Sequence, residues 1–255
     1  MSDITYFDCN TSLGRPSHGT YRPCPDAHSL LTEMDWVGVG LALVRHALMW
    51  EQSPVVGNAA ILEATDGEAR LLPTWAILPP QTRELGSDFF GSMRQAGVRA
   101  LWAFPARHRY LLRRRTFGSF LDEVADRRIP LFVPRDAGGP QPSDTWHLVY
   151  DLLDEYPTLT LVMAHQGPWG EDRFFRPLLE QCERFYLDLS RYELDCGLSA
   201  LVRDYGYRRL LYGSHFPETS MGGPRLQLAR AEIGDEARAA IAGGNLRSLL
   251  SEVSL

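Results

Sequence analysis

The chain has 255 residues, of which 44% are hydrophobic, and its 26 basic and 32 acidic side chains give a formal net charge of −6. This apolar fraction is ordinary for a globular protein with a core, and the acidic balance argues against general nucleic-acid binding, which needs a basic surface. Four widely spaced cysteines without a CxxC pair predict reduced thiols of a cytoplasmic protein rather than a disulfide framework.

The first residues, 1–7, carry neither the basic segment nor the apolar run of a signal peptide, so none is expected. No apolar run in the chain approaches the ~20 residues that span a bilayer, and we expect no membrane partner. Eight shorter runs, rich in Val, Ile, Leu or aromatic residues, predict β-strands at Ile4–Cys9, Val37–Val44, Leu71–Leu78, Val98–Phe104, Ile129–Val133, Leu159–Ala164, Phe185–Leu189 and Arg209–Gly213.

Helical spacing follows several of these strands and predicts helices at Phe117–Arg127, Asp144–Tyr156, Asp172–Arg184 and Leu194–Tyr205. Asp144 and Asp172 each open an amphipathic run and are expected to be N-caps. The segment Asp235–Val253 predicts one or two closing helices with a break at Gly243-Gly244.

Continuous apolar strands that alternate with helices predict a parallel sheet covered by helices. Eight such units in about 250 residues favour an α/β fold of the closed (β/α)8 TIM-barrel type. An open dinucleotide-binding sheet is disfavoured because no GxGxxG follows the first strand. No composition shift or long linker divides the chain, so we expect a single domain over residues 1–255.

Two irregular segments interrupt the alternation of strands and helices. The first, Gly14–Asp26, holds three prolines and is expected to be a lid or a wall over the barrel mouth. The second, residues 104–116, carries the strongest local positive charge, which ends in Arg113-Arg114-Arg115. In an acidic protein this run predicts a solvated helix start or an oligomer contact rather than a nucleic-acid site.

Polar side chains follow most of the predicted strands, at the end of the barrel where this fold carries its active sites. His165 and His215 are the best catalytic candidates, because two facing imidazoles can serve as general acid and base near neutral pH. The alternative is that each ring only hydrogen-bonds a backbone carbonyl beneath the loops. Asn10 and Ser12 are expected to hold a substrate oxygen or to position a water, or else to tie the first loop to the rim.

Arginines at the same strand ends suit the recognition of a carboxylate or phosphate, although a rim salt bridge is the common alternative for each. Trp102 could line a pocket for a planar ring or could be core packing. The expected substrate contacts are Arg45, His46, Trp102, Arg135, Gln166 and Arg191.

Four segments together resemble the amidohydrolase superfamily, in particular its amidohydrolase-related branch, which includes small-acid decarboxylases and a pyrone-dicarboxylate lactonase. They are Phe7–Asn10, Leu161–Gly167, Leu210–Pro217 and Ile241–Leu246, and their order and spacing cover nearly the whole chain. The resemblance implies a barrel hydrolase or decarboxylase, and members of this family often pair as homodimers.

The resemblance also implies five positions for metal ligands, which in this chain are Asn10, Ser12, Pro134, His165 and His215. His165 alone keeps the family's residue type, and amide, hydroxyl and proline side chains are poor ligands for zinc and similar ions. We therefore expect no metal cofactor at the inherited site. The alternative is a divalent ion such as zinc on relocated ligands, with His46, His165 and His215 joined by a carboxylate.

The sequence thus favours a hydrolase, or a decarboxylase, of a small carboxylated or cyclic substrate, in which most of the family's metal ligands are replaced. The alternative is a catalytically inactive barrel that binds a small ligand or acts as a regulatory protein. Either way the expected partner is a small, anionic molecule, because arginines recur at the strand ends.

Overall fold

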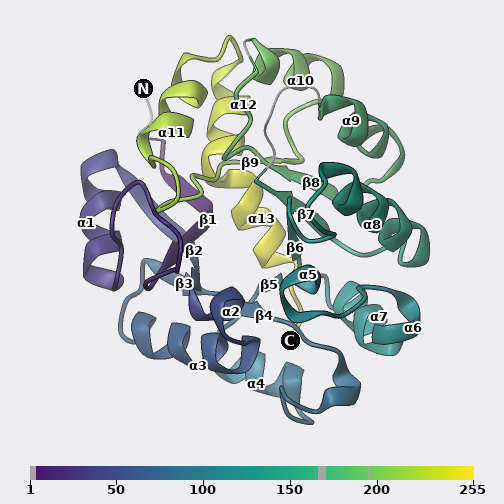
Figure 1. Ribbon diagram of the computed structural model, residues 1–255. Coiled ribbons are helices and arrows are strands. Elements are labelled where there is room, and N and C mark those ends of the chain that lie inside the picture. Colours follow the sequence, from purple (N-terminus) through teal and green to yellow (C-terminus); the bar gives the residue numbers. More distant parts are fainter. Residues whose placement is uncertain (1–3, 166–170, 195) are drawn as a thin grey trace.

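The computed structural model describes residues 4–165, 171–194 and 196–255, and its parallel strands form a closed barrel surrounded by helices (Figure 1). Hydrogen-bonded neighbours follow chain order, first in a sheet β1-β2-β3 and then in a sheet β4 to β9. The strands are β1 (Tyr6–Leu13), β2 (Val39–His46), β3 (Leu71–Pro73), β4 (Trp75–Ala76), β5 (Leu101–Trp102), β6 (Leu131–Pro134), β7 (Leu161–Ala164), β8 (Phe185–Asp188) and β9 (Leu210–Leu211).

Thr74 joins the two sheets, because β3 and β4 are consecutive parts of one barrel strand. Its N–H donates to the Val44 carbonyl at 2.9 Å, and the next N–H, of Trp75, donates to Ala100 at 3.2 Å. The barrel closes where Cys9 donates to Tyr212 at 2.9 Å and His215 donates to Asn10 at 2.8 Å. The predicted eight-stranded TIM barrel is therefore confirmed.

Helices cover the outside of the barrel and carry the chain from each strand to the next. They are α1 (Ala27–Val37), α2 (Leu48–Glu51), α3 (Pro54–Thr65), η1 (Pro80–Thr82), α4 (Phe89–Gln95), α5 (Pro105–His108), α6 (Arg114–Phe117), α7 (Ser119–Asp126), α8 (Pro142–Glu155), α9 (Asp172–Gln181), α10 (Gly197–Tyr205), α11 (Gly222–Arg230), α12 (Asp235–Ala239), η2 (Ala240–Gly244) and α13 (Asn245–Ser251). Within the described ranges, none of these helices is long and apolar enough to cross a membrane.

Both N-cap predictions are wrong. Helix α8 begins two residues earlier than expected, so Asp144 lies in its first turn, where its carboxylate accepts the Gln141 N–H at 3.1 Å. Asp172 is the first residue of α9, whose N-cap is Glu171. An acidic residue in the first turn is stabilised by the same helix dipole that favours an N-cap, so the sequence signal does not separate the two places.

The chain does not break at Gly243-Gly244, because this pair lies in the π-helical turn η2 between α12 and α13. A Cβ at Gly243 would lie 2.8 Å from the Thr5 carbonyl oxygen, so the missing side chain lets the helix pack directly on the start of β1. The final residues close the lower end of the barrel, where Arg99 and Arg127 donate to the carbonyls of Leu250 and Ser254. The other end, at the carboxyl termini of the strands, stays open.

Candidate active site

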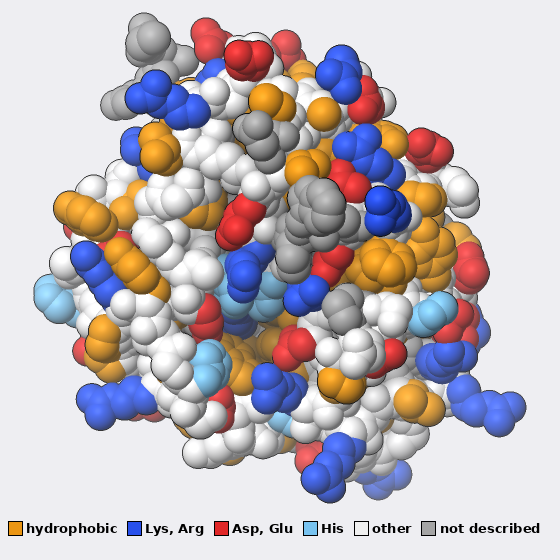
Figure 2. Space-filling model, turned by 45° about the horizontal axis from the view of Figure 1, so that its top comes forward, with side chains coloured by type: hydrophobic (Ala, Val, Ile, Leu, Met, Phe, Trp, Pro, Cys, Tyr) orange, Lys and Arg blue, Asp and Glu red, His pale blue; other side chains and the backbone are white. Residues whose placement is uncertain are grey.

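The open end of the barrel contains a cavity of about 240 Å³. Figure 2 shows this end hollowed, with basic and histidine side chains gathered around the hollow. The lining residues come from strand ends and from the loops and short helices that follow them: His18, Arg45, Trp50, Phe104, Arg107, Pro134, Arg135, Asp136, His165, Arg191, His215 and Glu218.

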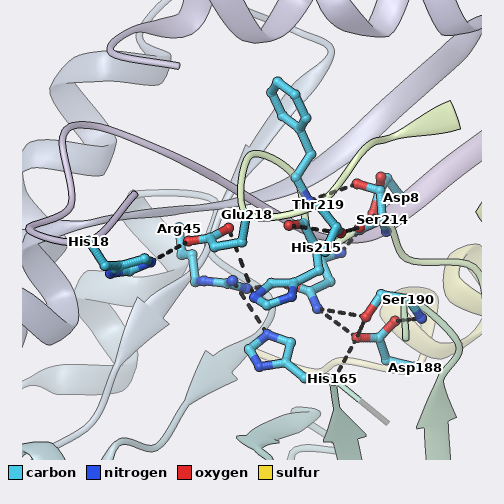
Figure 3. Close-up of polar contacts among 12 residues, drawn as sticks. Asp8, His18, Arg45, His165, Asp188, Ser190, Ser214, His215, Glu218 and Thr219 are labelled. Atoms are coloured by element: carbon cyan, nitrogen blue, oxygen red, sulfur yellow. Dashed lines mark hydrogen bonds and ion pairs between the residues drawn. The ribbon is translucent and has the colours of Figure 1, made fainter. Parts of the chain in front are cut away.

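His165 and His215 lie against each other on the floor of this cavity (Figure 3). Their ring centres are 3.7 Å apart and the ring planes are inclined by 22°. Both residues have left-handed backbone, with φ of 63° and 55°, which side chains other than glycine rarely adopt and which clusters at functional sites. The strain is held by the surroundings, since His165 N–H donates to Asp188 at 3.2 Å and the Thr219 N–H donates to the His215 carbonyl at 3.1 Å.

Both imidazoles are held neutral. Burial is the largest cause that lowers the pKa of His165 well below its usual value, and the neighbouring His215, Arg45, Arg191 and Arg135 lower it further. Burial also lowers the pKa of His215 strongly, again with help from Arg45 and Arg191. At neutral pH each ring therefore has one nitrogen free to accept a proton or a hydrogen bond.

A buried polar network under the rings joins β1 to β8. The Asn10 amide donates to Asp188 at 2.6 Å and to the Ser190 hydroxyl at 3.4 Å, and its oxygen accepts a hydrogen bond from Arg45. The Ser190 hydroxyl donates to the same Asp188 carboxylate at 2.8 Å. This carboxylate thereby fixes the backbone of His165 and the side chain that holds Arg45.

Asp8 lies one layer deeper in the barrel and is fully buried. One carboxylate oxygen accepts the N–H groups of Asn10 and Ser214, both at 2.9 Å. Burial raises its pKa to about 7, and the nearby Asp188, whose own pKa is raised by burial, adds to the effect. Gly213 leaves room for Asp188, because a Cβ there would lie 2.1 Å from the carboxylate.

Charged side chains around the cavity wall comprise four arginines and two carboxylates. At the rim Arg107 pairs with Asp136 at 3.2 Å, and Arg135 pairs with Glu171 at 2.5 Å. Arg45 and Arg191 form no ion pair with the described residues. The wall is thus electropositive, which suits an anionic ligand.

Glu218 is the carboxylate of the cavity wall that faces the His215 ring. One of its oxygens lies 3.9 Å from the His215 Nε2, and the other lies 3.7 Å from the Nε2 of His18. His18 belongs to the predicted lid or wall, Gly14–Asp26, and its second nitrogen lies 3.6 Å from Glu51. The segment Gly14–Asp26 therefore borders the cavity, as a wall.

The structure brings five of the predicted site residues together in the cavity wall: His165, His215, Arg45, Arg135 and Arg191. Four others do not line it. Asn10 and Ser12 are buried outside its lining, Trp102 is buried and stacks on Phe132, and the His46 side chain accepts the Leu48 N–H at 3.2 Å. Gln166 lies outside the described residues. The roles assigned to all ten stay predictions.

Sequence reasoning missed several lining residues because they come from loops or from the short helices α2 and α5 within them: His18, Trp50, Phe104, Arg107 and Glu218. Glu218 follows His215 by three residues, and that spacing was a usable signal for a carboxylate near the imidazole. The others have no pattern that marks them, since loops are placed by the whole fold.

The donors on the cavity floor do not fit a divalent cation. The Asn10 oxygen already accepts from Arg45, and another nitrogen of this guanidinium lies 3.5 Å from the His165 Nε2. A metal ion on these two donors would face a buried positive charge at close range. In addition, no group of three His, Cys, Asp or Glu side chains within the described ranges is arranged to hold a metal.

Comparison with known proteins gives a family and a fold. A family model described as Amidohydrolase matches residues 37–250. No curated protein matches the sequence.

Three solved structures illustrate the likeness in fold. An uncharacterized TIM-barrel protein from Bordetella bronchiseptica has a TM-score of 0.75 at 17% identity, over 98% of this chain and 99% of that one. The 5-carboxyvanillate decarboxylase of Sphingomonas paucimobilis has a TM-score of 0.75 at 13% identity, over 99% and 100%. A candidate 2-pyrone-4,6-dicarboxylic acid hydrolase from Pseudomonas putida has a TM-score of 0.70 at 16% identity, over 98% of each chain. Identities this low establish the fold alone.

Proposed function

Because the chain belongs to the amidohydrolase family, we propose that it is a hydrolase that opens a small, carboxylated lactone or activated ester with His215 as general base. The observation that carries the proposal is the pair of stacked, neutral imidazoles on the floor of a cavity whose wall is rich in arginine. The family includes enzymes that act on small carboxylated molecules, as two of the similar structures illustrate by name.

His215 is the better base of the two. The Nε2 of His165 faces the Arg45 guanidinium at 3.5 Å, so its lone pair points at a hydrogen-bond donor. The Nε2 of His215 instead lies 3.9 Å from the Glu218 carboxylate, which can offset the positive charge that the ring gains with a proton. His165 then holds its neighbour in place by stacking.

The proposed reaction begins with water in the cavity. The water oxygen attacks the carbonyl carbon of the substrate, the carbonyl π electrons move onto oxygen, and His215 takes the water proton. When the oxyanion collapses, the bond to the leaving oxygen breaks and that oxygen receives the proton from His215. The products are a carboxylic acid and an alcohol or enol, so one water is consumed and the base is regenerated.

The arginines make this chemistry dependent on an anionic substrate. Arg191 and Arg135 border the cavity and suit bidentate contact with a substrate carboxylate. Both positive charges lower the pKa of His165 in the free protein, and that of Arg191 also lowers the pKa of His215. A bound carboxylate neutralises these charges and raises the pKa of His215, which strengthens the base only when substrate is present.

The test is hydrolysis of a panel of lactones and activated esters with and without a carboxylate on the ring. We expect turnover of carboxylated members and a loss of roughly 10²- to 10⁴-fold in kcat/KM for His215→Ala. His147→Ala, an exposed histidine on α8, is the matched control and should keep full activity. If panel members bind tightly without turnover, the chain is a ligand-binding barrel and the hydrolase proposal is wrong.

A further inference from the structure

Arg45 is a buried cation that pairs with no carboxylate of the described residues. It is the penultimate residue of β2 with 3% of its surface exposed, and within the described ranges it forms no ion pair. Glu218, Asp188 and Asp8 favour its charged form only from longer range. A buried charge without a counter-ion destabilises the protein, so a bound anion would stabilise this arrangement.

The guanidinium is held in a fixed orientation by contacts on three sides. It donates to Asn10, whose amide is itself locked by Asp188, and it lies 3.5 Å from the Nε2 of His165. Its central carbon lies 4.4 Å from the ring centre of Trp102 and 5.3 Å from that of Trp50. A cation fixed in this way needs little reorganisation when negative charge develops beside it.

Access to this cation is through the cavity, since Arg45 lines it together with both stacked histidines. The aromatic rings of Trp50 and Phe104 line the same cavity. A ligand complementary to this lining is small, carries an anionic oxygen at one end, and has a flat apolar face.

We infer that Arg45 is the resident cation of this site, that its guanidinium binds an anionic oxygen of the ligand, and that it takes the electrostatic role for which other enzymes use a divalent ion. During hydrolysis the oxygen in question is the developing oxyanion. That second part rests on the proposed function, whereas the binding of an anion at Arg45 does not.

Benzoate is the probe, and benzamide is its uncharged match. Titration calorimetry with the wild-type chain should give benzoate binding at least tenfold tighter than benzamide binding, because only benzoate offers a charge. Arg45→Met should weaken the affinity for benzoate roughly 10- to 100-fold, as expected for loss of charge-assisted hydrogen bonds. Its affinity for benzamide should not change. Arg45→Lys, which keeps the charge, should bind benzoate with an affinity between those of the wild type and Arg45→Met.

The control is Arg203→Met, an exposed arginine on α10, which should bind benzoate as the wild type does. Circular dichroism and a thermal melt establish that each variant folds. Equal affinity of the wild type for benzoate and benzamide would overturn the inference without any variant, and so would unchanged benzoate binding in a folded Arg45→Met. Neither result depends on turnover, so a failed hydrolase proposal leaves this test intact.

A second measurement addresses the divalent ion. Titration of the wild-type chain with Mn²⁺ or Zn²⁺ should show no stoichiometric site, and benzoate affinity should be unaltered by either ion. Binding of one ion per chain that is lost in His165→Ala would contradict the inference, because it would place a metal where we place the guanidinium.

Discussion

The two ends of the barrel use arginine in opposite ways. At the lower end Arg209 donates to the carbonyls of Cys182 and Leu179 at 2.8 and 2.6 Å, and Arg184 pairs with Glu252 at 2.9 Å. At the upper end, among the residues that the structure describes, the Nε of Arg191 is buried without a hydrogen-bond partner, and Arg45 bonds an amide and faces an imidazole but pairs with no carboxylate. The lower arginines close the fold, whereas Arg45 and Arg191 at the upper end are left for a ligand.

This contrast separates stability from function on one scaffold. Polar groups that are fully paired stabilise the protein, whereas buried groups without partners reduce its stability and mark a place where binding compensates the cost. We therefore expect variants at the lower end to change the free energy of unfolding, and variants at the upper end to change ligand affinity and the rate of hydrolysis.

The largest effect concerns Asp8, between the two ends. Its pKa is raised to about 7 in the fold, whereas it is near 4 in the unfolded chain, so the folded state binds more protons between these values. Stability relative to Asp8→Asn should therefore fall as the pH rises from about 4 to 7, by an upper limit on the order of 4 kcal/mol. Urea unfolding of both proteins at pH 5 and pH 8 measures this, and an unchanged difference would contradict it.

At the lower end, Arg209→Met removes two charge-assisted hydrogen bonds to the carbonyls of Cys182 and Leu179, of which Cys182 keeps the N–H of Phe185 at 3.3 Å. We expect a loss of about 2–4 kcal/mol in the free energy of unfolding. Benzoate affinity should stay within about twofold of the wild type, because no lower-end arginine reaches the cavity. A large change in benzoate affinity with little change in the free energy of unfolding would contradict the structural role of Arg209.

At the upper end, Arg191→Met should weaken the affinity for benzoate roughly tenfold, as expected for the loss of one charged contact in a site that water reaches. Its free energy of unfolding should be unchanged or higher, because the variant removes a buried nitrogen that has no hydrogen-bond partner among the described residues. Calorimetry and urea unfolding of the same preparation test both halves. A destabilised variant with normal affinity would place Arg191 among the structural arginines.

The smallest effect is on the pH profile. Because the pKa of His215 lies well below 6.5 in the free protein, kcat/KM should stay near its plateau down to pH 6.5 and fall only at lower pH. Arg45→Met removes one cause of the lowering, so its acidic limb should move to higher pH. Rates measured between pH 4.5 and 8 report the shift, and a shift in the opposite direction would argue against His215 as the base.

The sequence predicts the barrel well because its strands are buried on both faces and read as continuous apolar runs. It predicts only part of the site. Adjacent residues on a strand point to opposite sides, so Arg45 faces the cavity and His46 does not, but the sequence does not tell which of the two points inward. Glu218 and His18 enter from loops whose course depends on tertiary contacts, such as that between Tyr21 and Pro217.

Asn10 shows a further limit. It follows a buried strand and carries a polar head, which predicts a substrate contact, yet it lies below the cavity and orients Arg45. The sequence pattern is the same for a residue that touches the ligand and for one that supports such a residue. Only the network around Asp188 distinguishes the two roles.

The central claim is that fixed arginine charge and a neutral histidine pair serve this site in place of a metal ion. The most direct test is the hydrolysis rate of the best carboxylated substrate, for protein purified without an affinity tag and dialysed against a chelator. We expect the same rate before dialysis, after dialysis, and after Mn²⁺ or Zn²⁺ is added back. A rate that is lost in the chelator and restored by one of these ions would contradict the account.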